Sequence, residues 1–201
     1  LEATPIIAEG RLYICSGNGR IAAVDPENGK EIWAVQPDSD NFSTYLISCR
    51  GVTYARDVKV EEGQLCAGKI FAGTLDGRML AFDSATGKAC PSFGAGGERD
   101  LGKYERGDVS VSSPAVVIGN NIVTNTRVAD NVRADMPAGV IRAFDIHTGQ
   151  PTWSWNALPP GMTDAANAPK GEKFVRSTPN SWAPMSADPA LNLVYVPMGN
   201  A

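Results

Sequence analysis

Ala23-Val-Asp25-Pro-Glu-Asn28-Gly29-Lys-Glu-Ile-Trp33 is the first of three copies of one phrase in this chain. The second copy is Ala81-Phe-Asp83-Ser-Ala-Thr86-Gly87-Lys88, and the third is Ala143-Phe-Asp145-Ile-His-Thr148-Gly149-Gln-Pro-Thr-Trp153. The aspartates of successive copies lie 58 and 62 positions apart. Such a repeat indicates a supersecondary unit that buries its apolar face against its neighbours.

An apolar run precedes each copy and has the length and the flanking residues of a β-strand. These runs are Leu12–Cys15, Ile70–Gly73 and Ile122–Thr124. Asn18-Gly19 and Asp76-Gly77 follow the first two runs and supply the residues that tight hairpin turns require. After the next strand, the pattern Asp-x-x-Thr/Asn-Gly predicts a second turn. In that turn the Asp side chain accepts backbone N–H groups and the Gly takes a positive φ.

Units built from strands stack radially, so the sequence predicts an all-β fold of the β-propeller type. Trp33 and Trp153 follow the turn glycine by four positions, and we expect each indole to wedge between adjacent sheets. The second copy has Pro91 at this position, so we expect its outer strand to be altered or replaced by the connection 93–106. A fourth unit is expected to begin at Leu193.

The 201 residues begin at Leu1 and stop inside the fourth repeat, so we expect residues 1–201 to be a partial propeller of about four blade-equivalents. The edges of such a part would invite pairing with the rest of the ring. The net charge of -4 and the pI near 5.0 argue against nucleic acid as a partner. No apolar run reaches the ~20 residues of a membrane helix.

The four cysteines do not have the spacing of a zinc site. Cys66 and Cys90 flank one hairpin, and a disulfide between them would suit an oxidising compartment. The alternative is that these two residues, Cys15 and Cys49 are small reduced side chains buried in strands. The sequence leaves both alternatives open.

Three segments are not explained by the blade repeat. They contain Cys49-Arg-Gly-Val-Thr-Tyr54, Thr126-Arg-Val-Ala-Asp-Asn131 and Pro179-Asn-Ser-Trp-Ala-Pro184. With these segments the chain resembles the quinoprotein alcohol and sugar dehydrogenases, which use pyrroloquinoline quinone (PQQ). It is most similar to the membrane-bound branch of glucose, quinate and polyol dehydrogenases, over essentially its whole length. The resemblance implies the first half of an eight-bladed propeller, with PQQ and a divalent cation near the central axis.

The resemblance implies five contacts of the chain with PQQ. Trp182 matches the floor beneath the ring, because a large indole suits a flat quinone. Arg50 matches the partner of a PQQ carboxylate, for which a guanidinium is well shaped. Glu2, Arg127 and Ser112 match further polar contacts, and Ser113 is the alternative to Ser112. Each has an ordinary alternative: a core tryptophan between blades, a surface arginine or a turn serine.

The resemblance also implies a metal site. Asp130 matches the acidic metal ligand, Asn131 follows it, and Asn200 lies 18 residues after Trp182, at the interval of an asparagine ligand in alcohol-oxidising relatives. Carboxylate and amide oxygens suit Ca²⁺ or Mg²⁺. The alternative for Asp130-Asn131 is a plain loop tip, where these residue types are common.

The implied reaction is the oxidation of a sugar, polyol or cyclic alcohol, with electrons passing to ubiquinone. The catalytic aspartate would lie beyond residue 201 in the family order, so the chain holds no expected catalytic residue and is expected to be inactive alone. The resemblance implies a periplasmic site, in a parent protein anchored in the inner membrane. Leu46 replaces a histidine of the glucose-specific branch, which puts glucose in doubt and leaves quinate, shikimate or another polyol open.

The only histidine, His147, is expected to be an exposed residue of the third Asp-x-x-Thr-Gly turn. The rival function is a non-catalytic propeller scaffold, like the outer-membrane assembly lipoproteins that use similar repeats. A scaffold would leave the segments around Arg50, Asp130 and Trp182 unexplained.

Overall fold

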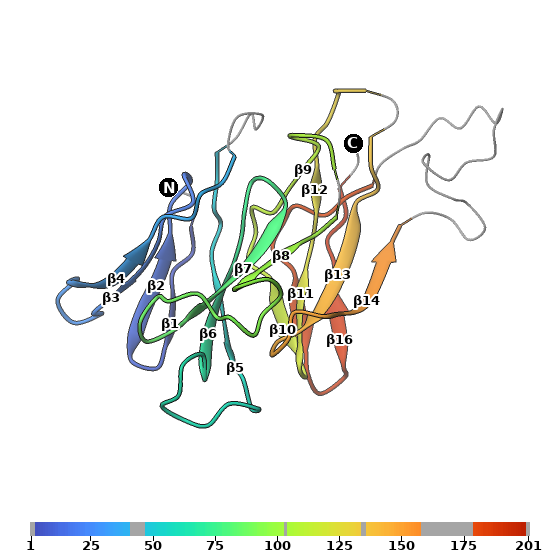
Figure 1. The fold of residues 1–201 in the computed structure, drawn as a ribbon. Coiled ribbons are helices and arrows are strands. Elements are labelled where there is room, and N and C mark those ends of the chain that lie inside the picture. The colour runs from blue at the N-terminus through green and yellow to red at the C-terminus, as the bar shows by residue number, and fades with distance from the viewer. Residues whose placement is uncertain (1–2, 41–46, 103, 134–135, 158–178, 200–201) are drawn as a thin grey trace.

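The computed structural model of the chain describes all residues except 1–2, 41–46, 103, 134–135, 158–178 and 200–201 (Figure 1). The described residues form strands and turns, which confirms the predicted all-β class. No helix that is long and apolar enough to cross a membrane occurs among them.

The described strands form three four-stranded antiparallel sheets and two two-stranded ones. The first sheet contains β1 (Ile6–Ala8), β2 (Arg11–Cys15), β3 (Ile21–Val24) and β4 (Glu31–Val35). The second contains β5 (Thr53–Arg56), β6 (Gly68–Gly73), β7 (Arg78–Asp83) and β8 (Glu98–Asp100). The third contains β10 (Val116–Ile118), β11 (Asn121–Thr124), β13 (Val140–Asp145) and β14 (Pro151–Asn156). The fourth contains β15 (Ser186–Asp188) and β16 (Leu193–Tyr195), and β9 (Val109–Ser110) pairs separately with β12 (Arg127–Val128).

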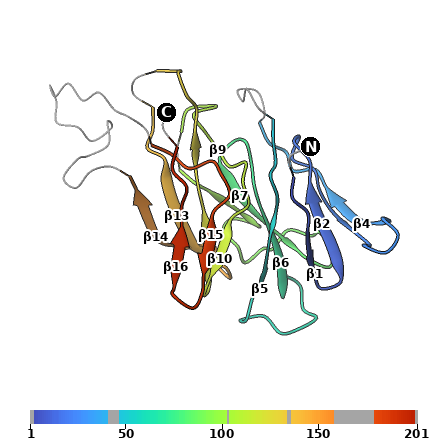
Figure 2. The ribbon, with the colours of Figure 1, turned by 180° about the vertical axis from the view of Figure 1, so that it is seen from behind.

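The four sheets stand side by side as propeller blades that do not close into a ring (Figure 1). The first strands of neighbouring blades contact one another, β1 with β5, β5 with β10 and β10 with β15, and they follow one another across the molecule in Figure 2. These first strands are therefore the innermost ones. The predicted partial propeller is confirmed.

The core lies between the blades. Tyr13, Trp33 and Ile70 pack between the first and second blades. Phe71, Phe93 and Phe144 pack between the second and third. Stability therefore depends on neighbouring blades, as the repeat predicts.

The predicted turns are present. Gly19 and Gly77 have φ of 84° and 82° in the hairpins between second and third strands. In the second blade, Asp83 Oδ1 accepts the backbone N–H of Thr86 (2.8 Å), and Gly87 has a φ of 72°. The turn aspartate also accepts a backbone N–H in the other two blades, from Glu27 in the first (2.9 Å) and from Thr148 in the third (2.8 Å), and Gly29 and Gly149 have positive φ. We call the end of the blades that carries the Asp-x-x-Thr/Asn-Gly turns the turn end.

Trp33 confirms the predicted wedge between sheets. Its side chain is buried, and its Nε1–H donates to the carbonyl oxygen of Ser84 in the second blade (2.9 Å). Trp153 differs, because its side chain is 40% exposed. The described part of the fourth blade has two innermost strands and no Asp-x-x-Thr-Gly turn on which Trp153 would pack.

The second blade closes differently, as Pro91 predicts. Its outer strand β8 is short and pairs only with Arg78–Leu80. Cys66 and Cys90 form a disulfide, so the expected alternative of reduced cysteines is wrong. Phe93 is fully buried, and the backbone N–H of Gly94 donates to Thr148 O of the third blade (2.9 Å). This loop takes the place of the missing tryptophan.

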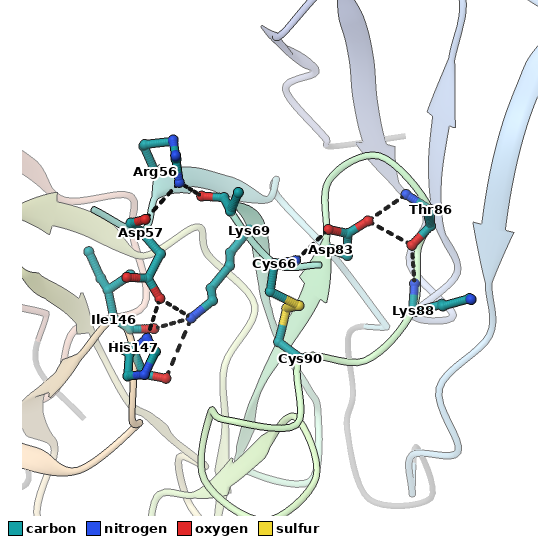
Figure 3. Close-up of a disulfide and its surroundings, with 11 residues drawn as sticks. Arg56, Asp57, Cys66, Lys69, Asp83, Thr86, Lys88, Cys90, Ile146 and His147 are labelled. Atoms are coloured by element: carbon teal, nitrogen blue, oxygen red, sulfur yellow. Dashed lines mark hydrogen bonds and ion pairs between the residues drawn. A yellow bond between two sulfur atoms is a disulfide. The ribbon is translucent and has the colours of Figure 1, made fainter. Parts of the chain in front are cut away.

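A buried ionic cluster joins the second and third blades at the turn end (Figure 3). The ammonium of Lys69 donates to Asp57 Oδ2 (2.6 Å), to Ile146 O (2.9 Å) and to His147 O (3.4 Å). His147 Nδ1 lies 2.8 Å from the same carboxylate oxygen. The expectation of an exposed His147 is wrong, because its side chain is 30% exposed and is bound by Asp57 from the neighbouring blade.

The predicted start of the fourth unit is also wrong. The unit begins at β15, seven residues before Leu193. The innermost strands are only three residues long in β1, β10 and β15. Such short strands carry little periodic pattern, and the sequence analysis missed them.

Candidate cofactor site

The predicted cofactor residues occupy equivalent places in successive blades. Arg50 lies three residues before β5, Ser112 four before β10 and Trp182 four before β15. Because the innermost strands are adjacent and run in the same sense, the segments that lead into them meet at one end of the partial ring. We call this the lead-in end, and it lies opposite the turn end. Glu2 stands four residues before β1 in the sequence but lies outside the described residues.

The structure brings Arg50, Ser112 and Trp182 together. The guanidinium of Arg50 donates from Nη1 to Ser112 Oγ (2.6 Å), and its Cζ lies 5.6 Å from the centroid of the Trp182 ring. The backbones are joined as well, because the N–H of Arg50 donates to Ser112 O (2.7 Å). A cation over an indole is attracted by the ring quadrupole, so the pair is mutually stabilising.

Trp182 is fixed through its backbone while its ring stays open. Ser113 Oγ–H donates to Trp182 O (2.5 Å), and Asn125 Nδ2–H donates to Ala183 O (2.9 Å). Trp182 as a whole residue is nevertheless 44% exposed, whereas Trp33 is buried between blades. An anchored but exposed indole beside a guanidinium has the chemistry to bind a flat ligand that carries carboxylates.

The loop with Asp130 and Asn131 is tied to the same region. It follows β12, in which Arg127 pairs with Ser110. Asp130 and Asn131 are both exposed. The backbone N–H of Val128 donates to Asn180 Oδ1 (3.3 Å), which connects this loop to the Trp182 segment. Within the described part of the chain, no hydrogen bond or ion pair joins Asp130, Asn131 or the Arg127 side chain to Trp182. These three residues stay candidates on the strength of the resemblance.

Asp108 anchors the base of this loop. Its carboxylate accepts both terminal nitrogens of Arg133, at 2.7 and 2.5 Å, and its carbonyl accepts the N–H of Ala129 (2.9 Å). Such a bidentate arginine–carboxylate pair is geometrically specific. Asp130 and Asn131 therefore extend from a loop that is held on both sides, between Ala129 and Arg133.

The described residues contain no group of three or more His, Cys, Asp or Glu side chains able to hold a metal. Asn200, the third predicted ligand, lies outside the described residues, as does Leu46. Gly199, which precedes Asn200, exchanges backbone hydrogen bonds with Asn180 (2.8 and 3.1 Å). Gly199 therefore lies beside the segment that carries Trp182.

Sequence reasoning missed a second disulfide next to the site. Cys49, the residue before Arg50, is bonded to Cys15 at the end of β2. The two cysteines are 34 positions apart and flank no single hairpin, so no local signal pairs them. All four cysteines are thus in disulfides.

Comparison with known proteins agrees with this geometry. The family model for the β-propeller domain of PQQ-dependent glucose, ethanol and alcohol dehydrogenases matches residues 1–201. The glycerol dehydrogenase large subunit of Gluconobacter oxydans (strain 621H) is 41% identical over 205 residues. The quinate/shikimate dehydrogenase (quinone) of Acinetobacter baylyi (strain ATCC 33305 / BD413 / ADP1) is 32% identical over 220 residues. Both alignments cover 100% of this chain and 27% of the relative, so the chain spans about a quarter of these proteins.

Solved structures support the fold. The quinohemoprotein alcohol dehydrogenase ADHIIG from Pseudomonas putida HK5 superposes with a TM-score of 0.74 at 24% identity, over 98% of this chain and 28% of that one. The quinohemoprotein alcohol dehydrogenase of Comamonas testosteroni gives the same TM-score of 0.74 at 23% identity. With the family model matching every residue, this chain belongs to the PQQ-dependent glucose, ethanol and alcohol dehydrogenase family and is part of its β-propeller domain.

Proposed function

We propose that this chain supplies part of the PQQ-binding end of a quinoprotein dehydrogenase. The enzyme would oxidise a sugar, polyol or cyclic alcohol and pass the electrons to a quinone. The observation that carries the proposal is the meeting of Arg50, Ser112 and the exposed ring of Trp182 at the lead-in end. A scaffold needs no such group, and the relatives that match the whole chain carry the names of dehydrogenases.

The residues present fit PQQ, a flat tricyclic quinone with three carboxylates. Trp182 would support one face of the ring, and Arg50 would pair with a carboxylate at its edge. Ser112 orients the guanidinium through its 2.6 Å hydrogen bond. Arg127 and Glu2 are proposed as further polar contacts from the neighbouring segments.

A divalent cation, Ca²⁺ or Mg²⁺, is proposed beside the cofactor. Asp130, Asn131 and Asn200 offer the hard oxygen ligands that such ions prefer. When bound, PQQ supplies a quinone that takes up a hydride equivalent from the carbinol, and the cation supplies Lewis acidity. This chain's part is to hold and orient both groups, and the proton of the substrate hydroxyl would pass to a residue outside the chain.

Two disulfides support a periplasmic location, because such bonds persist in oxidising compartments. The substrate class follows from the relatives. The 41% identical protein is named a glycerol dehydrogenase, and Leu46 stands where the glucose branch has a histidine. A polyol or cyclic polyalcohol is therefore favoured over glucose.

The test uses the full-length enzyme that contains these residues. The apo-protein would be reconstituted with PQQ and with Ca²⁺ or Mg²⁺, and dye reduction would be assayed with glycerol, quinate and glucose. Trp182→Ala should bind PQQ about 5- to 150-fold more weakly, since base-to-aromatic stacking of comparable rings is worth about 1–3 kcal/mol. Trp155→Ala, which removes an exposed indole of the outer strand β14, is the control. Folded protein that binds no PQQ would leave the scaffold as the function.

A further inference from the structure

The segment that carries Arg50 has little secondary structure to hold it. No strand is described between Val35, the end of β4, and Thr53, the start of β5. Main-chain contacts fix it at a few points: the N–H of Thr4 donates to Arg50 O (2.9 Å), and the N–H of Arg50 donates to Ser112 O (2.7 Å). Both hydrogen bonds reach into the lead-in segments of neighbouring blades.

One covalent bond ties this segment to the core. Cys15 ends β2, pairs with Ile21 of β3 and is 2% exposed. Its sulfur is bonded to Cys49, which directly precedes Arg50, with 6.0 Å between the two Cα atoms. The residue directly before Arg50 is therefore covalently anchored to the first blade.

The approach of the segment to the first blade is close. A Cβ on Gly17, two residues after Cys15, would lie 2.6 Å from Ile47 O. Ser48 is buried between Ile47 and Cys49. The disulfide thus stands at the centre of the contact between the segment and the hairpin that follows β2.

We infer that the Cys15–Cys49 disulfide is a positioning element for Arg50. It holds the segment in the position from which the guanidinium of Arg50 contacts both Ser112 Oγ and the Trp182 ring. The identity of the ligand, PQQ, rests on the proposed function, whereas the positioning of Arg50 does not. The two cysteines would act through the backbone, because Cys49 directly precedes Arg50 in the chain.

The other disulfide is a matched control within the same molecule. Cys66–Cys90 closes a chain segment of similar length, with 24 positions between the cysteines against 34. It lies at the turn end, near Lys69 and Asp83 (Figure 3). Loss of either bond is expected to lower stability, since both cross-links restrict the unfolded chain. Only loss of Cys15–Cys49 is expected to release Arg50.

The experiment compares Cys15→Ser/Cys49→Ser with Cys66→Ser/Cys90→Ser in the full-length apo-enzyme. Hydrogen exchange of peptides that contain Arg50 should lose about tenfold or more of its protection in the first variant and little in the second. The dissociation constant for PQQ, measured by tryptophan quenching, should rise about tenfold in the first variant only, as expected when a charged hydrogen bond is weakened.

The outcomes separate the two proposals. Unchanged protection at Arg50 and an unchanged PQQ affinity in Cys15→Ser/Cys49→Ser would overturn the positioning role. If the variant loses protection at Arg50 but the folded wild-type protein binds no PQQ, the proposed function is overturned and the positioning role is kept. If the first variant does not fold, stepwise reduction of the folded wild-type protein replaces it. The exposure of Arg50 should then follow the alkylated fraction of Cys15 and Cys49, and exposure that follows Cys66 and Cys90 instead would overturn the inference.

Discussion

At the scale of single residues, Lys69 places an ionisable side chain inside the core of the described chain. Its side chain is fully buried, where an isolated ammonium would be strongly disfavoured. Each of its three N–H donors has an acceptor, namely Asp57 Oδ2 and the carbonyl oxygens of Ile146 and His147 (Figure 3). Two of these acceptors belong to the third blade, so the charge is satisfied only when the second and third blades are docked.

Asp57→Asn tests this dependence. The change leaves the buried Lys69 without a counter-charge, and we expect a loss of about 3–5 kcal/mol in the free energy of unfolding. Glu31→Gln is the control, because it breaks the Arg20–Glu31 pair, which is 2.8 Å long against 2.6 Å for Lys69–Asp57 but has side chains that are 46% and 48% exposed. That change should cost less than about 1 kcal/mol. Urea unfolding measures both, and equal losses would contradict the buried role of Lys69.

The lowered pKa of Asp57 predicts that the free energy of unfolding depends on pH. Burial acts to raise the pKa of this carboxyl, but the hydrogen bonds from Lys69 and His147 outweigh it and lower the pKa below the ordinary value of 3.8. A group whose pKa is lower in the folded state contributes stability above its unfolded pKa and loses it as pH falls through the folded pKa. The unfolding free energy of the wild type should therefore fall below about pH 4. Asp57→Asn should show a shallower fall in the same titration, and parallel curves would contradict the assignment.

At the scale of elements, the Asp-x-x-Thr/Asn-Gly turn reverses the chain and can also contact the tryptophan of the neighbouring blade. A comparison of two of its copies distinguishes these two roles. Gly29 and Gly87 both have a φ of 72°, so an added side chain strains both backbones alike. A Cβ on Gly29 would meet nothing within 4 Å, whereas a Cβ on Gly87 would lie 2.7 Å from Cε3 of Trp33. Gly29 is therefore required only for the turn conformation, whereas Gly87 also leaves the space in which the Trp33 indole of the neighbouring blade packs.

Gly29→Ala and Gly87→Ala form a matched pair of variants. Gly29→Ala should cost about 1–2 kcal/mol, the strain of a left-handed alanine. Gly87→Ala should cost about 1–3 kcal/mol more, because Trp33 must shift from its seat. Thermal unfolding of the two variants gives the difference. Equal melting temperatures would mean that the contact of Trp33 with this turn adds nothing to the docking of the blades.

The same elements show what the sequence can predict. Second and third strands and their turns carry local signals, such as Asp76-Gly77 and Asp83-x-x-Thr-Gly87, and these predictions are confirmed. The innermost strands have three residues in β1, β10 and β15 and depend on neighbours, so no local pattern marks them. The Cys15–Cys49 bond and the contact of His147 with Asp57 each join segments of different blades. Both were missed for the same reason. Arg50, Ser112 and Trp182 were found through the family resemblance, and the structure adds their contact.

At the scale of the whole molecule, the first two seams between blades are closed by different chemistry at equivalent positions. Trp33 closes the first seam through the carbonyl of Ser84. Phe93, Gly94 and the Lys69 cluster close the second, where the carbonyl of Ile146 occupies the place of Ser84 one residue after the turn aspartate. The repeat therefore conserves a backbone acceptor while the donor changes from an indole to an ammonium. The two ends of the propeller then differ in purpose: the turn end carries these seams, and the lead-in end carries the candidate cofactor site.

The third seam predicts a difference between this chain alone and the complete propeller. Trp153 holds the place of Trp33, four residues after the turn glycine, but its ring is 40% exposed. In the complete protein we expect it to pack on the corresponding turn of the fourth blade and to become buried like Trp33. Hydroxyl-radical footprinting of the 201-residue chain and of the full-length enzyme measures this. Trp153 should lose most of its oxidation in the enzyme, since a buried aromatic excludes the solvent radical, and Trp33 should be protected in both. Equal oxidation of Trp153 in the two proteins would mean that the third seam does not use the tryptophan wedge of the first.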